Sequence, residues 1–268
     1  MTNSWRRKRQ LTFISIFILI ILAFTFYKIY PYLNPAPTCF DNKQNGEERG
    51  VDCGGGCPLI CKSDIYPIEE RFSRFIETED NLYDFVAMIN NKNVDKMPEG
   101  GMLEYNFTIY DMAGNVAKVV NGSTPVMIGQ TFPIVAQNVP IDFGDSGNAI
   151  SRVTFNVLNN EANWVAVDEV FKNNFFRVIN TEFIPLKNNV SQLNVSLQNI
   201  TRAYFRDVPV RVLLLDEYEN VFAVNETLIK EIDGNGTIDL NFSWRVPLKK
   251  ENPKIEVYPI VTPNTYLR

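Results

Sequence analysis

Four cysteines are the residues of this chain best suited to chemistry, and they lie within 23 residues of one another: Cys39, Cys53, Cys57 and Cys61. Thiols this close together form disulfides or bind a metal ion. Their spacings lack the paired Cys-x-x-Cys knuckles of strong zinc sites, and so short a segment needs covalent staples because it cannot bury a core. We expect two disulfides, with zinc as the less favoured alternative. Three pairings exist, and the sequence does not choose among them.

Oxygen ligands accompany the cysteines in the same segment: Asp41, Asn45, Glu47, Glu48 and Asp52. Carboxylate and amide oxygens are the ligands that calcium prefers. Their spacing fits no EF-hand loop, so solvated acidic side chains are the favoured interpretation. Calcium at the cysteine-rich module is kept as a minor hypothesis, and we expect no other metal or cofactor.

The chain contains no histidine. This removes the commonest general base, the commonest transition-metal ligand and every Ser-His-Asp or Cys-His arrangement. A Gly-rich phosphate loop and a nucleophile elbow are also missing from the sequence. We therefore expect a protein that is not an enzyme and has no catalytic residues. A carboxylate-based enzyme acting on glycans, which needs only two suitably spaced acids, is the least favoured alternative.

An apolar segment near the N-terminus indicates a membrane anchor. Residues 11–27 carry no charge, and with the residues that follow they predict one transmembrane helix over 11–30. A basic cluster precedes it, made of Arg6, Arg7, Lys8 and Arg9. The positive-inside rule therefore places residues 1–10 in the cytoplasm and the rest outside the plasma membrane. A cleaved signal peptide is the alternative, but its apolar core runs to only about 7–15 residues.

The charge of the remaining chain argues against a nucleic-acid partner. Residues 1–30 hold five of the 26 basic side chains and no acid, which leaves 21 basic against 31 acidic side chains in the rest. An acidic surface repels phosphates. We expect the membrane and a protein or envelope component as partners.

Short alternating apolar and polar runs, separated by Gly, Asn, Asp and Pro, fill the chain from Ile65 onward. This pattern predicts antiparallel strands in sandwiches. The expected fold is mainly β, with an N-terminal transmembrane helix, a small disulfide-rich module and two tandem Ig-like antiparallel β-sandwiches. The expected parts are a spacer over 31–38, the module over 39–61, a sandwich over 62–160, a linker over 161–174 and a sandwich over 175–268. The linker holds Trp164 and is a candidate hinge, at which Trp164 is expected to pack; an exposed aromatic that binds a partner is the alternative.

An internal repeat supports two copies of one module. Its matched segments are Val86–Asn90 with Val195–Asn199, Phe107–Asp111 with Val212–Asp216, and Arg152–Val157 with Lys254–Tyr258. The three pairs occur in the same order at offsets of about 100 residues. Asp111 and Asp216 end their strands at a turn, where a carboxylate can accept backbone N–H groups.

Two resemblances follow from these motifs. The string C-x-D-x3-N-G-E-x2-G-V-D-C-G-G-x-C-x3-C over 39–61 resembles a short cysteine-rich module of bacterial cell-surface proteins. The strand and turn with Phe107, Tyr110 and Asp111 resembles the bacterial FxLYD domain, and Asn90, Asn91 and Asn93 before it also resemble the late-embryogenesis-abundant water-stress domain. These families imply Ig-like sandwiches. Because Phe107 lies on the core face of its strand and Asp111 ends that strand at a turn, we expect a structural role for the three motif residues.

These observations together predict a non-enzymatic, membrane-anchored extracytoplasmic protein. It would present tandem β-sandwich modules for adhesion, envelope structure or partner binding. An accessory subunit of a membrane export or pilus-type complex is the alternative. The middle of the apolar segment offers only Ala23 as a small residue, which counts against tight pairing with a partner helix.

Overall fold

The computed structural model describes residues 3–33, 36–79, 81–143, 149–158, 163–187, 190–245, 247–248 and 252–267. The chain forms two compact units, Met1–Pro58 and Leu59–Arg268. Among the described residues, the first unit holds the long helix and most of the cysteine-rich module, and the second holds every strand.

The first unit begins with α1 (Asn3–Leu33). Its candidate membrane span Trp5–Leu33 is 29 residues long and contains an apolar window of 18 residues; the whole stretch measures about 43 Å against about 30 Å of membrane hydrocarbon. By length and composition it could span a membrane. The basic cluster lies in its N-terminal part: Arg6, Arg7, Lys8 and Arg9. The helix is longer at both ends than the predicted segment, and Pro31, predicted in a spacer, lies in its last turn.

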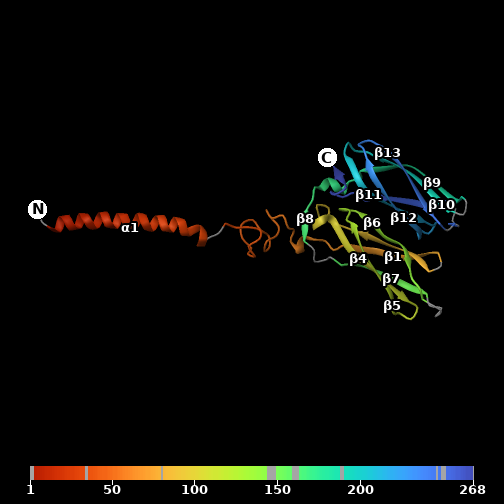
Figure 1. Cartoon of the computed structure of the whole chain (residues 1–268), viewed down its shortest axis with the longest axis horizontal. Helices are drawn as coiled ribbons and strands as arrows, with labels where there is room; N and C mark the ends of the chain where they lie inside the picture. The colour runs from red at the N-terminus through yellow and green to blue at the C-terminus, as the bar shows by residue number, and fades with distance from the viewer. Residues whose placement is uncertain are drawn as a thin grey trace. The chain divides into compact units, whose positions relative to one another are not determined.

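Two three-stranded antiparallel sheets form the first sandwich of the second unit (Figure 1). One sheet has the order β1 (Glu69–Glu79), β2 (Leu82–Asn90), β6 (Thr131–Pro140). The other has the order β5 (Val116–Pro125), β4 (Met102–Asp111), β7 (Ile150–Val157). Alternate residues of β2, β4, β6 and β7 face a shared core that contains Phe85, Phe107 and Phe132.

The second sandwich is built in the same way. One sheet has the order β13 (Thr237–Trp244), β10 (Val190–Asn199), β9 (Phe176–Lys187). The other has the order β12 (Val221–Ile232), β11 (Tyr204–Leu215), β14 (Lys254–Pro259), and β15 (Tyr266–Leu267) also pairs with β11. Leu193, Val212 and Phe242 belong to its core. The predicted mainly β fold with two antiparallel sandwiches is confirmed.

The strand order shows that the two sandwiches are copies of one topology. Strands β1, β2, β4, β5, β6 and β7 correspond to β9, β10, β11, β12, β13 and β14. Two of the predicted matches have the right register, because Phe107 and Val212 both lie in a core, as do Phe155 and Val257.

The third predicted match, of Val86–Asn90 with Val195–Asn199, is wrong by one residue. Val195 faces its core, but Val86 lies on the opposite face of β2, and Ala87 occupies the core position. Successive strand residues point to opposite faces, so a slip of one residue exchanges the core side for the outer side. Ala87 is therefore the counterpart of Val195.

The segment predicted as a linker is packed over its described part, 163–174. It carries β8 (Trp164–Ala166), which pairs with β3 (Lys96–Pro98), and the short helix η4 (Glu169–Lys172). Two further short helices are η1 (Lys62–Asp64) and η2 (Glu99–Gly101). Trp164 is 5% exposed and Phe171 joins the second core. Trp164 therefore packs inside the unit, and it is not an exposed aromatic.

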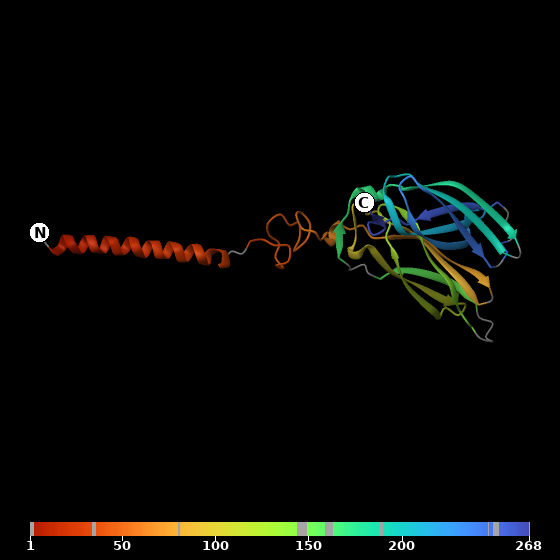
Figure 2. The same ribbon diagram turned by 45° about the horizontal axis from the view of Figure 1, so that its top comes forward.

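The two sandwiches lie side by side and share an apolar interface (Figure 1, Figure 2). Val86 and Met88 on the outer face of β2 belong to one buried cluster with Leu213 of β11 and Val224 of β12. Strands β2 and β11 are thus buried on both faces. This explains why their sequences are continuous apolar runs with little alternation.

One buried charged side chain makes hydrogen bonds across the same interface. Arg211 of β11 is 4% exposed. Its guanidinium donates through Nε to Glu226 Oε2 at 2.5 Å, and through its two terminal nitrogens to the Pro133 carbonyl at 2.6 Å and Thr124 Oγ1 at 2.7 Å. Pro133 and Thr124 belong to the first sandwich, so Arg211 ties the second sandwich to the first.

Candidate functional site

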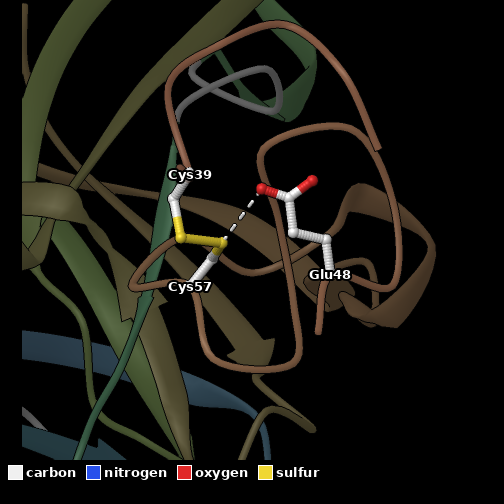
Figure 3. Close-up of side chains that lie close together, drawn as sticks. All are labelled: Cys39, Glu48 and Cys57. Carbon is white, nitrogen blue, oxygen red and sulfur yellow. Dashed lines mark hydrogen bonds between the residues drawn. A yellow bond between two sulfur atoms is a disulfide. The ribbon is translucent and has the colours of Figure 1, made fainter. Parts of the chain in front are cut away.

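All four cysteines of the module are disulfide-bonded. Cys39 pairs with Cys57, with Cα atoms 5.6 Å apart. Cys53 and Cys61 are disulfide-bonded as well, and no cysteine is free. The prediction of two disulfides is confirmed. Figure 3 shows Glu48 beside the first pair, with Oε1 3.5 Å from Cys57 Sγ. Sulfur atoms bonded to each other do not supply the thiolates that a zinc site needs.

The acidic side chains of the module hold its turns. Asp52 accepts the backbone N–H of Asp41 at 3.0 Å and that of Asn42 at 2.9 Å. Glu48 Oε2 accepts the backbone N–H of Asn45 at 3.2 Å. The Asn45 side-chain amide donates to Asp41 Oδ2 at 2.9 Å, and this bond is the main reason that the pKa of Asp41 is lowered. A calcium ion would compete with these donors, so the contacts favour a structural role.

The motif residues of the first sandwich also have structural places. Phe107 lies fully buried in the core. Tyr110 faces the neighbouring strand β7, and the guanidinium carbon of Arg152 lies 4.1 Å from the centre of its ring. Such a cation–π contact stabilises a cross-strand pair.

Asp111 and its repeat counterpart Asp216 cap equivalent turns by bonding the asparagine four residues later, and Asp216 Oδ1 also accepts the Tyr218 backbone N–H at 3.0 Å. Asp111 Oδ1 accepts the backbone N–H of Asn115 at 2.8 Å, and Asp216 Oδ1 accepts that of Asn220 at 2.8 Å. In both turns the asparagine amide lies 3.4 Å from the second carboxylate oxygen. The two carboxylates therefore have a turn-capping role.

A groove of about 480 Å³ opens in the first sandwich, lined by residues at the start of β1 and at the end of β7; we call it the first groove. Its apolar lining includes Leu103, Phe155 and Trp164, which are all buried. Tyr66, which is 58% exposed, lines it as well. The charged lining residues are Lys62 and Glu70. An apolar floor with a few polar groups at the edge is typical of a binding site.

The second sandwich has a groove of about 270 Å³ at the corresponding place; we call it the second groove. Phe176 at the start of β9 and Val257 on β14 line it, as Ile68 and Phe155 line the first groove. Residues of the first sandwich, Met127 among them, also line the second groove. The contact between the sandwiches therefore narrows the second groove and leaves the first one larger.

The backbone of β7 presents polar groups along the first groove. Leu158 N–H donates to the Glu104 carbonyl of β4 at 2.8 Å. Residues of an antiparallel strand point their N–H and C=O groups alternately to one neighbour and to the other side. Phe155 is opposite Phe107 in this register, three residues from Leu158, so its N–H and C=O point away from β4. Val153, two residues earlier, accepts a bond from Ser73 of β1 through the same edge.

Sequence reasoning missed the groove, although some of its lining residues lie in segments that the sequence singled out: Phe155 is in the repeated segment Arg152–Val157, and Trp164 is in the predicted linker. Lys62, Leu103, Phe155 and Trp164 come from four separate segments that only the fold brings together. One signal was available: Trp164 follows a strand of the first copy in the sequence and has no counterpart in the internal repeat. An aromatic residue outside the repeated strands marks a place where the copies differ.

No family model and no curated protein matches this chain. Among solved structures, it is similar to a Bacteroides uniformis β-glucuronidase 2 with 10% identity and a TM-score of 0.18, over 61% of this chain and 21% of that one. A β-glucuronidase of glycoside hydrolase family 2 matches with 10% identity and a TM-score of 0.19, over 78% of this chain and 25% of that one. The chain thus spans about a quarter or less of these enzymes. Likenesses this weak carry no argument about function.

Proposed function

We propose that this chain is a non-enzymatic, single-pass membrane protein that displays two joined β-sandwiches on the outer side of the membrane. The observation that carries the proposal is a helix of membrane-spanning length followed by a fully disulfide-bonded module. Disulfides persist in oxidising compartments outside the cytoplasm. The basic cluster before the helix favours a cytoplasmic N-terminus.

The displayed part binds a protein or envelope component through the first groove. The apolar interface and the buried bonds of Arg211 support a joined pair of sandwiches with little freedom between them. A rigid pair suits presentation of a binding surface, because little conformational entropy is lost on binding. The resemblance to FxLYD-like surface modules is in keeping with this role and stays a prediction.

Photo-crosslinking in intact cells tests the binding function. A photoreactive phenylalanine analogue replaces Tyr66 in the first groove or, as a control, Tyr218 in the turn between β11 and β12, which is 76% exposed. We expect a discrete cross-linked partner from position 66 and none from position 218. Equal patterns from both positions, or no product from position 66, would contradict the proposal.

A further inference from the structure

The disulfide of Cys39 and Cys57 has a carboxylate beside it. Glu48 Oε1 lies 3.5 Å from Cys57 Sγ (Figure 3). One oxygen of Glu48 and the two sulfur atoms all lie within 4.8 Å of one another. Because the Cys57 sulfur is bonded to Cys39, it has no proton to donate to the carboxylate. The structure therefore sets a negative charge directly against the disulfide.

The local backbone holds this carboxylate in place. Glu48 Oε2 accepts the backbone N–H of Asn45 at 3.2 Å and that of Asp52 at 3.3 Å, and these two bonds direct Oε1 to the disulfide. Gly55 allows the close approach of the two chain segments. Its φ is +61°, and a Cβ there would lie 1.7 Å from the Glu47 carbonyl oxygen. Only glycine therefore fits where the cysteine-bearing segment passes the chain next to Glu48.

Reduction of this disulfide by a thiol creates negative charge beside Glu48. A thiolate attacks one sulfur, and the other sulfur leaves with the electron pair of the broken bond. Attack at the partly exposed Cys39 releases Cys57 as a thiolate, 3.5 Å from the carboxylate oxygen. Attack at Cys57 brings the incoming thiolate itself toward Glu48. Like charges at such distances repel each other, so the carboxylate slows both routes.

We propose that Glu48 protects the disulfide of Cys39 and Cys57 from reduction by external thiols. Complete reduction takes two thiols. The first forms a mixed disulfide with Cys39, and Cys57 leaves as a thiolate that takes a proton from water. The second attacks the outer sulfur, which releases Cys39 and leaves the two external thiols joined as a disulfide. Glu48 slows the first step. This protection is independent of the first groove, so its failure would leave the proposed binding function standing.

The test follows reduction of the full chain in lipid nanodiscs by 2-mercaptoethanol. Free thiols are alkylated after set times, and mass spectrometry measures the alkylated fraction of each cysteine. Glu48→Gln removes the charge and keeps an oxygen that can accept the two backbone N–H groups. We expect Cys39 and Cys57 to be reduced about fivefold faster in this variant, and Cys53 and Cys61 within about twofold of the parent chain. Unchanged rates at Cys39 and Cys57 would overturn the inference.

Two controls separate the loss of a charge from a loosening of the module. A loosened module would expose all four cysteines, so equal acceleration at all four would overturn the inference. Glu47→Gln removes the neighbouring acidic side chain, which is exposed and lies outside the close group of Glu48 and the two sulfur atoms. We expect its rates to stay within about twofold of the parent chain. An acceleration equal to that of Glu48→Gln would also overturn the inference.

Ionic strength supplies a measurement that needs no variant. Salt screens the repulsion between charges, and the screening length falls to about 3 Å at about 1 M salt. In the parent chain we expect this salt to accelerate reduction of Cys39 and Cys57 about threefold more than reduction of Cys53 and Cys61. We expect the excess to vanish in Glu48→Gln. An equal salt response at all four cysteines of the parent chain would overturn the inference, even should Glu48→Gln fail to fold.

Discussion

Asp84 is a carboxyl group in surroundings that disfavour its charge. It lies on β2 and is 3% exposed, and its Oδ1 accepts the backbone N–H of Asn138 at 2.8 Å. Burial raises the pKa of Asp84 above the ordinary value of 3.8, and the bond from Asn138 opposes this only in part. The native state therefore holds the proton more tightly than the unfolded chain does, and the ionised side chain costs stability near neutral pH.

We expect Asp84→Asn to raise the melting temperature by a few degrees at neutral pH, because the amide keeps an acceptor oxygen and has no charge to bury. The gain is complete above the raised native pKa. It disappears as the pH falls below the unfolded value of 3.8, where Asp84 is protonated in both states. Melting curves of both proteins from neutral pH to below pH 3.8 show whether the difference in melting temperature has the expected sign and pH dependence. A gain that persisted in acid would contradict burial of charge as the cause.

The two turn-capping carboxylates offer a paired measurement. Asp111→Ala removes the acceptor of the Asn115 N–H, and Asp216→Ala removes the acceptor of the equivalent Asn220 N–H and of the Tyr218 N–H. We expect each substitution to lower the free energy of unfolding by about 1–2 kcal/mol, and Asp111→Asn to cost less because it retains an oxygen. Urea unfolding gives these values. A cost confined to Asp111 would point to a special role at that turn.

At the scale of elements, Arg211 determines how firmly β11 is joined to β5 and β6. Arg211→Ala leaves the Pro133 carbonyl and the Thr124 hydroxyl buried without their donor, whereas Glu226 is partly exposed and can turn to solvent. We expect a loss of about 3 kcal/mol and a calorimetric transition that splits in two as the sandwiches uncouple. Arg211→Met with Thr124→Val should recover part of that loss. A single, unshifted transition would show that the apolar cluster suffices.

How well the sequence predicts a strand depends on whether one face or both faces of the strand are buried. Around Phe107 and Val212 apolar and polar residues alternate, which indicates one buried face, so those strands and the repeat could be predicted. The apolar run around Val86 is buried on both faces, so alternation could not fix its register, and the match slipped by one residue. The first groove depends on where separate segments end relative to one another. No local pattern of residue types encodes that, so its lining was beyond sequence reasoning.

At the scale of the whole molecule, every functional proposal depends on which side of the membrane carries the sandwiches. Labelling of single added cysteines with a membrane-impermeant maleimide in intact cells measures this most directly. The account predicts that Tyr218→Cys, at a position 76% exposed, is labelled in intact cells, and that Ser4→Cys is labelled only after lysis. Labelling of Ser4→Cys in intact cells, with Tyr218→Cys protected until lysis, would place the sandwiches in the cytoplasm and contradict the account.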